Sequence, residues 1–379
     1  SSRLSVAVFA AVAPRYYAAP LMPKSSPIPL DQLAPDRICL IKPSALGDVV
    51  QALPVLSGLR QRWPEAHISW VINRGLAPLL AQHPELDDVI AFDRNARGHK
   101  MLGSAYHLTR RLRRGRFDLT IDLQGLARSG LMTMATRARR RLGMSIAREG
   151  AALAYTDCIR IPTRDMPAVP RNWLIAQALG CQGNPPPARL GILAEQRSWA
   201  RNTLSGLPRP LVAIHPGAAW ATKRWPAGHF VSVARQALQQ QGAGVVLVGS
   251  GADVPLCDAI AAQLPQSHCA NLGGQTDLLM LAAVLEAADV MLAGDSGPMH
   301  LAAAVGTPVV AVFTCTSPLR AGPHGEGHRI AATGVPCAAS YLKTCNSMIC
   351  MQELAPHRVS QALGATIDET RSLHRQQAG

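Results

Sequence analysis

The chain has 379 residues, a formal net charge of +14 and 48% hydrophobic residues, with only 4% aromatic. This length allows two domains with separate cores, and the 31 glycines and the Ala-, Val- and Leu-rich composition favour layered α/β structure over a β-sandwich. No apolar run reaches the roughly 18–20 residues that a membrane-spanning helix needs.

The positive charge is concentrated in the first half of the chain. Residues 37–189 contain 23 Lys and Arg against 11 Asp and Glu, whereas residues 191–379 contain 12 against 11. The first half is therefore expected to meet an anionic partner.

The nine cysteines are scattered through apolar segments, which is typical of reduced thiols in the cytosol rather than of a disulfide framework. Cys337, Cys345 and Cys350 come nearest to a metal-binding spacing. No C-x2-C pair is present and no fourth ligand is evident, so packed thiols are favoured over a zinc site.

Residues 1–36 are not expected to belong to the fold. Residues 4–13 are faintly apolar and Pro-rich sequence follows, but the apolar stretch is short and poor in leucine for a secretory leader. A flexible extension or a misassigned start is the expectation.

From residue 37 the chain alternates between short apolar strands and helical segments, one of which is predicted at about 49–62. This alternation predicts a doubly wound parallel sheet, hence a Rossmann-like domain over residues 37–185. The predicted strands are 37–41, 67–72, 88–92 and 117–122.

The loop after the first predicted strand contains Lys42, Ser44, Gly47 and Asp48. A structural interpretation makes Asp48 the N-cap of the following helix beside a turn glycine. A functional interpretation makes it a carboxylate at the carboxyl edge of the sheet, kept ionised by the helix terminus and able to accept a proton from a hydroxyl.

Two further candidate binding features lie in this half, one in a loop and one in a set of basic side chains. Gln124 and Arg128 follow the fourth strand and could bind a ligand at the same sheet edge, although a capped turn with a solvated arginine fits equally well.

The basic field contains eight basic residues without an acid, followed by five arginines: Arg94, Arg97, Lys100, Arg110, Arg111, Arg113, Arg114, Arg116, then Arg137, Arg139, Arg140, Arg141 and Arg148. Anionic headgroups or phosphorylated sugars suit this field; nucleic acid is the competing partner, but aromatic interleaving and known binding motifs are absent.

Asn184–Pro187 is the best linker candidate, and the strand–helix pattern restarts after it. A second Rossmann-like domain with a C-terminal helical tail is predicted over residues 195–379. Its expected strands are 211–214, 244–249, 288–292 and 309–313, with a helix at 228–240.

The last two of these strands enclose a helix predicted from about Pro298 to Val305. Ser296 or Asp295 can cap this helix, and Gly297 allows a ligand close to the backbone. Its N-terminus would offer free N–H groups to a phosphate, with the His300 ring pointing back toward it. The plainer alternative is a capped core helix with a satisfied histidine.

Two more loops in this half carry candidate ligand contacts. Lys223 and Gly217 lie in the segment after the strand at 211–214, where an exposed basic turn over a packed Trp225 is the structural alternative. Ser250 lies between two glycines after the next strand, a weak indication of nucleotide binding.

Taken together, these segments resemble the ADP-heptose:lipopolysaccharide heptosyltransferases, glycosyltransferase family 9. The resemblance covers about residues 37–359, although Ala218 and Ala219 stand where some members have threonines. The matching strings are Asp295–Ala304 for D-[ST]-G-P-x-H-x-A-A-A, Ser44–Asp48 for S-x-x-G-D, Asp122–Ser129 for D-x-Q-G-x-x-[KR]-S and His215–Pro226 for H-P-G-x…K-x-W-P.

This resemblance implies a GT-B fold of two facing Rossmann-like domains. It implies an inverting transferase that moves heptose from ADP-L-glycero-D-manno-heptose to the lipopolysaccharide inner core, in the cytoplasm and peripheral on the inner face of the inner membrane. Asp48 would be the general base. Donor contacts would come from Lys223, Asp295, Ser296, Gly297, His300, Gly217 and Ser250, and acceptor contacts from Lys42, Ser44, Gly47, Gln124 and Arg128.

No cofactor is expected, and no metal, because the chain contains no D-x-D pair. The alternatives are a GT-B transferase or epimerase that uses another nucleotide sugar, and a non-catalytic protein that binds nucleic acid or another anion. An NAD-dependent dehydrogenase is disfavoured because no G-x-G-x-x-G follows the first strand.

Overall fold

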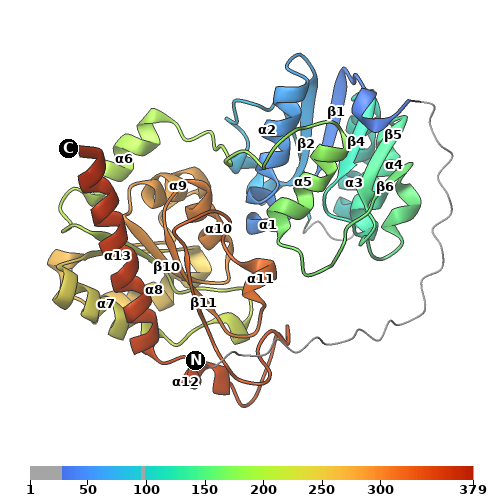
Figure 1. Cartoon of the computed structure of the whole chain (residues 1–379). Coiled ribbons are helices and arrows are strands. Elements are labelled where there is room, and N and C mark those ends of the chain that lie inside the picture. Colours follow the sequence, from blue (N-terminus) through green and yellow to red (C-terminus); the bar gives the residue numbers. More distant parts are fainter. Residues whose placement is uncertain (1–27, 95–98, 379) are drawn as a thin grey trace, which may run out of the picture.

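The computed structural model describes residues 28–94 and 99–378. Two lobes are visible in Figure 1, each built on a six-stranded sheet flanked by helices. The strand pairs in both sheets are parallel. The predicted α/β class with two Rossmann-like halves is therefore confirmed.

The first lobe contains six strands in the spatial order β3-β2-β1-β4-β5-β6. The strands are β1 (Arg37–Ile41), β2 (His67–Asn73), β3 (Asp88–Phe92), β4 (Leu119–Asp122), β5 (Arg140–Met144) and β6 (Asp157–Ile159). The helices are α1 (Leu46–Val50), α2 (Leu53–Arg62), α3 (His99–Arg114), α4 (Ala127–Thr136) and α5 (Ala168–Ala178).

The second lobe repeats this arrangement in the order β12-β11-β10-β7-β8-β9. The strands are β7 (Leu211–His215), β8 (Gly244–Gly249), β9 (Cys269–Gly273), β10 (Val290–Gly294), β11 (Val309–Phe313) and β12 (Arg329–Ala332). The helices are α6 (Ala194–Leu204), α7 (Ala227–Gln241), α8 (Val254–Ala261), α9 (Leu278–Glu286), α10 (Gly297–Ala304), α11 (Pro318–Ala321), α12 (Ile349–Glu353) and α13 (Pro356–Ala378).

The two sheets share one topology. In each, the first and fourth strands in sequence are neighbours, and the remaining strands are added outward on either side of this pair. In the first sheet β1 pairs with β4, and in the second β7 pairs with β10. Doubly wound sheets bind ligands beyond the carboxyl ends of the strands at such a switch point. The loops after these four strands are therefore where each lobe should present its functional side chains.

Four strands escaped sequence prediction: β5, β6, β9 and β12. β6 and β12 end their sheets, are short and are partly exposed, so they lack a continuous apolar run. β5 begins with Arg140 and Arg141, which hid its strand character. The helix predicted at 49–62 is divided into α1 and α2, with Pro54 in the first turn of α2.

Part of the segment expected to lie outside the fold packs on the first lobe. Trp63 Nε1 donates a hydrogen bond to the carbonyl of Leu33 at 3.2 Å, and Arg62 donates to that of Asp31 at 2.8 Å. Residues 28–36 thus belong to the lobe, whereas residues 1–27 of the expected extension lie outside the described residues.

Two arginines of the basic field serve the fold instead of facing a partner. Arg140 makes a two-pronged ion pair with Asp157, at 2.9 and 2.8 Å, and Arg141 donates to the carbonyls of Ala154 and Ala138. Of the field, Arg97 lies outside the described residues. No described helix is long and apolar enough to cross a bilayer.

We expect Asp157→Asn to destabilise the first lobe by about 2–3 kcal/mol, because it leaves the nearly buried Arg140 guanidinium without its anion. Asp88→Asn removes the partner of Arg111 in a more exposed pair and should cost under about 1 kcal/mol. Urea unfolding followed by circular dichroism compares the two variants, and equal losses would contradict this assignment.

Candidate active site

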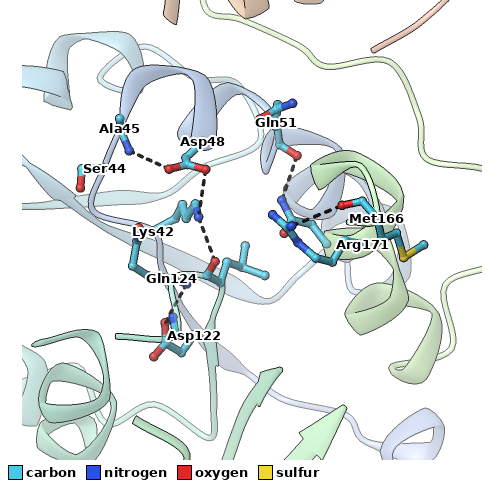
Figure 2. Close-up of polar contacts among 12 residues, drawn as sticks. Lys42, Ser44, Ala45, Asp48, Gln51, Asp122, Gln124, Met166 and Arg171 are labelled. Atoms are coloured by element: carbon cyan, nitrogen blue, oxygen red, sulfur yellow. Dashed lines mark hydrogen bonds and ion pairs between the residues drawn. The ribbon is translucent and has the colours of Figure 1, made fainter. Parts of the chain in front are cut away.

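The loop after β1 brings Lys42 against Asp48. Lys42 Nζ lies 3.6 Å from Asp48 Oδ1, and Figure 2 shows these two side chains facing each other. Lys42 also donates a hydrogen bond to the carbonyl of Leu123 at 3.0 Å. Asp48 is not the N-cap that the sequence suggested. It is the third residue of α1, and its carboxylate accepts a hydrogen bond from the N–H of Ala45 at 3.1 Å.

The surroundings of Asp48 favour its ionised form. Desolvation by the surrounding protein raises the pKa of Asp48. The charge of Lys42 and the hydrogen bond from the N–H of Ala45 outweigh this desolvation and hold the pKa below its usual value. His300 and Arg171 act in the same direction. At neutral pH the site therefore contains a carboxylate ready to accept a proton.

The loop after β4 is shaped by the buried carboxylate of Asp122. It accepts hydrogen bonds from the backbone N–H groups of Gln124 and Gly125 and from the hydroxyls of Ser129 and Tyr155, all at 2.8–3.0 Å. Burial raises the pKa of Asp122 despite these four donors. Asp122 thus holds the loop that presents Gln124, whose Oε1 is buried and has no partner among the described residues.

A polar cavity of about 250 Å³ joins these two loops. Lys42, Asp48 and Gln124 line it, as the sequence predicted for one sheet edge. Four arginines complete the lining, and the last of them comes from α11 of the second lobe: Arg148, Arg164, Arg171 and Arg320. The cavity therefore lies between the lobes and is strongly positive.

Sequence reasoning missed Arg164, Arg171 and Arg320. None of them lies in a recognisable motif, and only the tertiary fold brings them to one cavity. Arg148 was counted only as part of the basic field. A general surplus of arginine in the first half was the one signal available.

Two predicted acceptor residues lie elsewhere. Arg128 lines a separate cavity beside α3, together with Arg94. Arg94 in turn donates to Ser44 Oγ at 3.3 Å. Neither Ser44 nor Arg128 lines the cavity that contains Asp48.

In the second lobe, the loop after β10 starts α10 without a side-chain cap. Ser296 occupies the N-cap position, but its hydroxyl meets His215 Nδ1 at 3.2 Å instead of a backbone N–H. Asp295 does not cap the helix either: its Oδ2 lies 2.6 Å from Lys223 Nζ and accepts from the Thr316 hydroxyl. The first N–H groups of α10 are left for an anion.

The two lobes touch where α1 meets α10. A Cβ on Gly297 would strike the side chain of Leu46, and one on Gly47 would strike the ring of His300. Both glycines are therefore required for this approach. His300 is buried, its Nδ1 has no partner among the described residues, and burial lowers its pKa, so the ring is neutral at pH 7.

The predicted contacts Gly217 and Ser250 surround Asp253, a residue that the sequence analysis had not singled out. The N–H and hydroxyl of Ser250 both donate to Asp253 Oδ2, and a Cβ on Gly217 would strike the same carboxylate. The His215 ring, whose Nε2 lies 3.8 Å from Asp253 Oδ2, and the hydrogen bonds from Ser250 lower the pKa of Asp253. The absence of a side chain at Gly217 thus leaves room for Asp253, and contact of Gly217 with a ligand stays a prediction.

The cysteine segment differs from the expectation of packed thiols. Cys350 is buried, but Cys337 and Cys345 are exposed. Within residues 28–94 and 99–378, no group of three His, Cys, Asp or Glu side chains is placed to hold a metal ion.

Comparison with known proteins identifies this arrangement. The family model of "Glycosyltransferase family 9 (heptosyltransferase)" matches residues 105–349, more than half of the chain. The chain belongs to glycosyltransferase family 9. It is accordingly an enzyme, a glycosyltransferase.

Similar proteins extend the match over most of the chain. Lipopolysaccharide heptosyltransferase 1 of Pseudomonas aeruginosa is 30% identical over 290 residues, 74% of this chain and 79% of the relative. Lipopolysaccharide core heptosyltransferase OpsX of Haemophilus influenzae is 27% identical over 298 residues, 77% of this chain and 83% of the relative.

Solved structures confirm the GT-B fold of this glycosyltransferase. The structure of ADP-heptose lps heptosyltransferase II from E. coli matches with a TM-score of 0.71 and 26% identity, and the match covers 88% of this chain and 99% of that one. A family 9 glycosyl transferase from Veillonella parvula matches with a TM-score of 0.77 over 90% of this chain and 99% of that one, at 24% identity.

Gly47→Ala tests the contact between the lobes. Alanine favours a helix more than glycine does, so any loss must come from the new methyl group against His300. We expect kcat/KM for sugar transfer to fall about 10–100-fold with little change in Tm, because the two lobes no longer meet in the same geometry. Gly228→Ala near the start of α7, where a Cβ meets nothing, is the control, and equal activity of both variants would refute the prediction.

Proposed function

We propose that this glycosyltransferase moves heptose from ADP-L-glycero-D-manno-heptose to the lipopolysaccharide inner core, with inversion at the anomeric carbon. The observation that carries the proposal is the junction of α1 and α10, where an ionised carboxylate from one lobe faces an uncapped helix N-terminus from the other. The family match and the names of the curated relatives support the choice of sugar and acceptor.

The donor diphosphate is assigned to the N-terminus of α10. Backbone N–H groups there and the Lys223 ammonium would bind the phosphate oxygens. Asp295 is itself an anion, so its role is to hold Lys223 in place through their 2.6 Å ion pair. Ser296 and Gly297 supply the start of the helix, and the neutral His300 ring supplies a hydrogen-bonding nitrogen beside it.

The reaction follows from this placement. Asp48 takes the proton of an acceptor hydroxyl, and the oxygen attacks the anomeric carbon from the face opposite the diphosphate. The bond from that carbon to the phosphate oxygen breaks, and ADP leaves with its negative charge stabilised by Lys223 and the α10 N-terminus. Attack opposite the leaving group inverts the anomeric centre.

This scheme assigns the charge stabilisation to protein groups, so we propose that transfer requires neither a metal ion nor a cofactor. The lysine and helix N-terminus occupy the place where a metal-dependent transferase would bring a cation to the diphosphate. Measured transfer in the presence of a chelator is expected to equal transfer in its absence.

The acceptor side is assigned to residues 37–185 and the donor side to residues 195–379. Lys42, Gln124 and the arginines around the polar cavity would bind the anionic groups of core sugars, with Gly47 shaping the wall against His300. Such an acceptor is attached to a lipid, so we propose that the enzyme works in the cytoplasm, peripheral on the inner face of the inner membrane.

Replacing the base tests the mechanism. Asp48→Ala should lower the rate of ADP release from ADP-heptose, in the presence of heptose-deficient core lipid, by about 10²–10⁴-fold, with donor binding little changed. Glu65→Ala, an exposed carboxylate of the same lobe, is the control. Full turnover by Asp48→Ala would remove the assignment, and release from UDP-sugars instead of ADP-heptose would change the donor.

The pH profile tests how Lys42 acts on Asp48. Because the pKa of Asp48 is lowered, the carboxylate form persists to a pH below the usual range of an aspartate, and kcat/KM should be lost only below that range. Lys42→Met removes the main charge that lowers this pKa, and the acid limb should move to higher pH. Arg139→Met removes one exposed charge from the same lobe and should leave the limb in place. An unmoved limb in Lys42→Met would contradict the assignment.

A further inference from the structure

A second cavity, larger than the one that contains Asp48, lies elsewhere on the first lobe. It has a volume of about 460 Å³ and lies between α3 and α4 on the first lobe. On α3 it is lined by Met101, Ala105, Leu108 and Leu112, which share one face of the helix. A volume of this size is within the range of small-molecule sites.

The cavity has a buried apolar floor and an exposed apolar rim. Leu112 and Met132 are nearly inaccessible at 0% and 6%, whereas Met101 and Leu131 are exposed at 54% and 67%. Apolar rims of this kind are rare on monomeric surfaces and mark interaction sites when they are contiguous. The floor offers aliphatic contact, while the polar side chains of Ser104 and Thr109 also line the cavity, so an occupant with an aliphatic part fits it best.

Large apolar side chains continue around the rim on the same two helices. Leu102 and Tyr106 on α3 and Met134 on α4 are exposed at 70%, 63% and 55%. α3 ends in exposed arginines, among them Arg113 and Arg114. An amphipathic helix with apolar and cationic side chains is the usual element for contact with an anionic lipid surface.

Charged side chains also lie at the cavity itself. Arg94 and Arg128 line it, and so does Asp93. The Arg94 guanidinium reaches Ser44 Oγ in the loop that leads to Asp48. A ligand that fills the apolar cavity would therefore place an anionic headgroup at the arginines, on the side of the proposed catalytic carboxylate.

We propose that this cavity binds one acyl chain of an anionic lipid, and that the lipid is the acceptor held by its tail. The proposal rests on the proposed function, because it specifies the chemistry by which the acceptor is recognised. The aliphatic floor contacts the chain, and Arg94 and Arg128 contact the phosphate. The enzyme thus recognises its acceptor at two places, the sugar beside Asp48 and the chain between α3 and α4.

Filling the cavity is the direct test. Ala105→Trp places an indole inside it, whereas Leu102→Trp places one on the same helix outside the lining and keeps the exposed apolar surface. Binding is measured by calorimetry with a lysophosphatidic acid of 12 carbons below its critical micelle concentration, and with glycerol 3-phosphate as the chain-free probe. Circular dichroism verifies that both variants are folded.

We expect the lysolipid to bind the unmodified protein and Leu102→Trp alike, and glycerol 3-phosphate to bind at least tenfold more weakly. Each buried methylene contributes about fourfold in affinity, so excluding as few as two in Ala105→Trp should cost more than about tenfold. Equal lysolipid binding by all three proteins would overturn the proposal. Equal binding of the two probes would also overturn it, because the phosphate alone would then suffice.

A transfer assay separates this inference from the proposed function. The ratio of KM for deacylated to acylated core acceptor should exceed one in the unmodified enzyme and in Leu102→Trp, and fall toward one in Ala105→Trp. Chain-dependent binding without any heptose transfer would refute the proposed function and support the acyl-chain site. Transfer with a KM ratio of one in all three proteins would refute the acyl-chain site and leave the proposed function standing.

Discussion

The close approach of α1 and α10 determines the geometry of the whole site. Each lobe carries a glycine at this point, Gly47 on one side and Gly297 on the other, and each glycine lies where a Cβ would strike the opposite lobe. Asp48 follows the first glycine and Ser296 precedes the second. The distance between the proposed base and the proposed phosphate site is therefore set by two rigid backbones at the switch points of two sheets, and not by long side chains from mobile loops.

Each side of this junction pairs a lysine with an aspartate, but the two pairs serve opposite purposes. Lys42 is nearly buried and keeps the half-exposed Asp48 ionised. Asp295 is nearly buried and is bonded by Thr316, so it fixes the position of Lys223. The same pair of residue types thus prepares a carboxylate for proton transfer in one lobe and an ammonium for phosphate in the other.

The sequence was sufficient for the architecture and for the loops that face the cleft. The buried central strands β1, β8 and β11 run over the residues that their apolar runs predicted, because parallel central strands carry this signal within a few residues. The edge strand β3 was also predicted, because residues 89–92 form an apolar run, whereas the shorter edge strands β6 and β12 have no such run and were missed.

Side-chain partners were harder to predict than backbone positions. Arg171 and Arg320 join the cavity from α5 and α11, elements far apart in sequence, and no local pattern distinguishes them from solvated arginines. Ser296 stands at the N-cap position, yet its hydroxyl is hydrogen-bonded to His215. The two residues meet because β7 and β10, which precede them, are neighbours in the sheet. The sequence pattern around Gly217 also gave no sign that Asp253 occupies the space where a side chain would lie.

The described chain passes from the first sheet to the second only once, between α5 and α6 (Figure 1). The last helix, α13, stays on the second lobe, where it packs along α7 and against β12. The two halves are thus joined by one covalent connection and by the contact between α1 and α10. The single connection also makes each half a continuous stretch of sequence. If the first half binds the acceptor as proposed, one splice near residue 190 would exchange that half between relatives and transfer its acceptor preference to an unchanged second half.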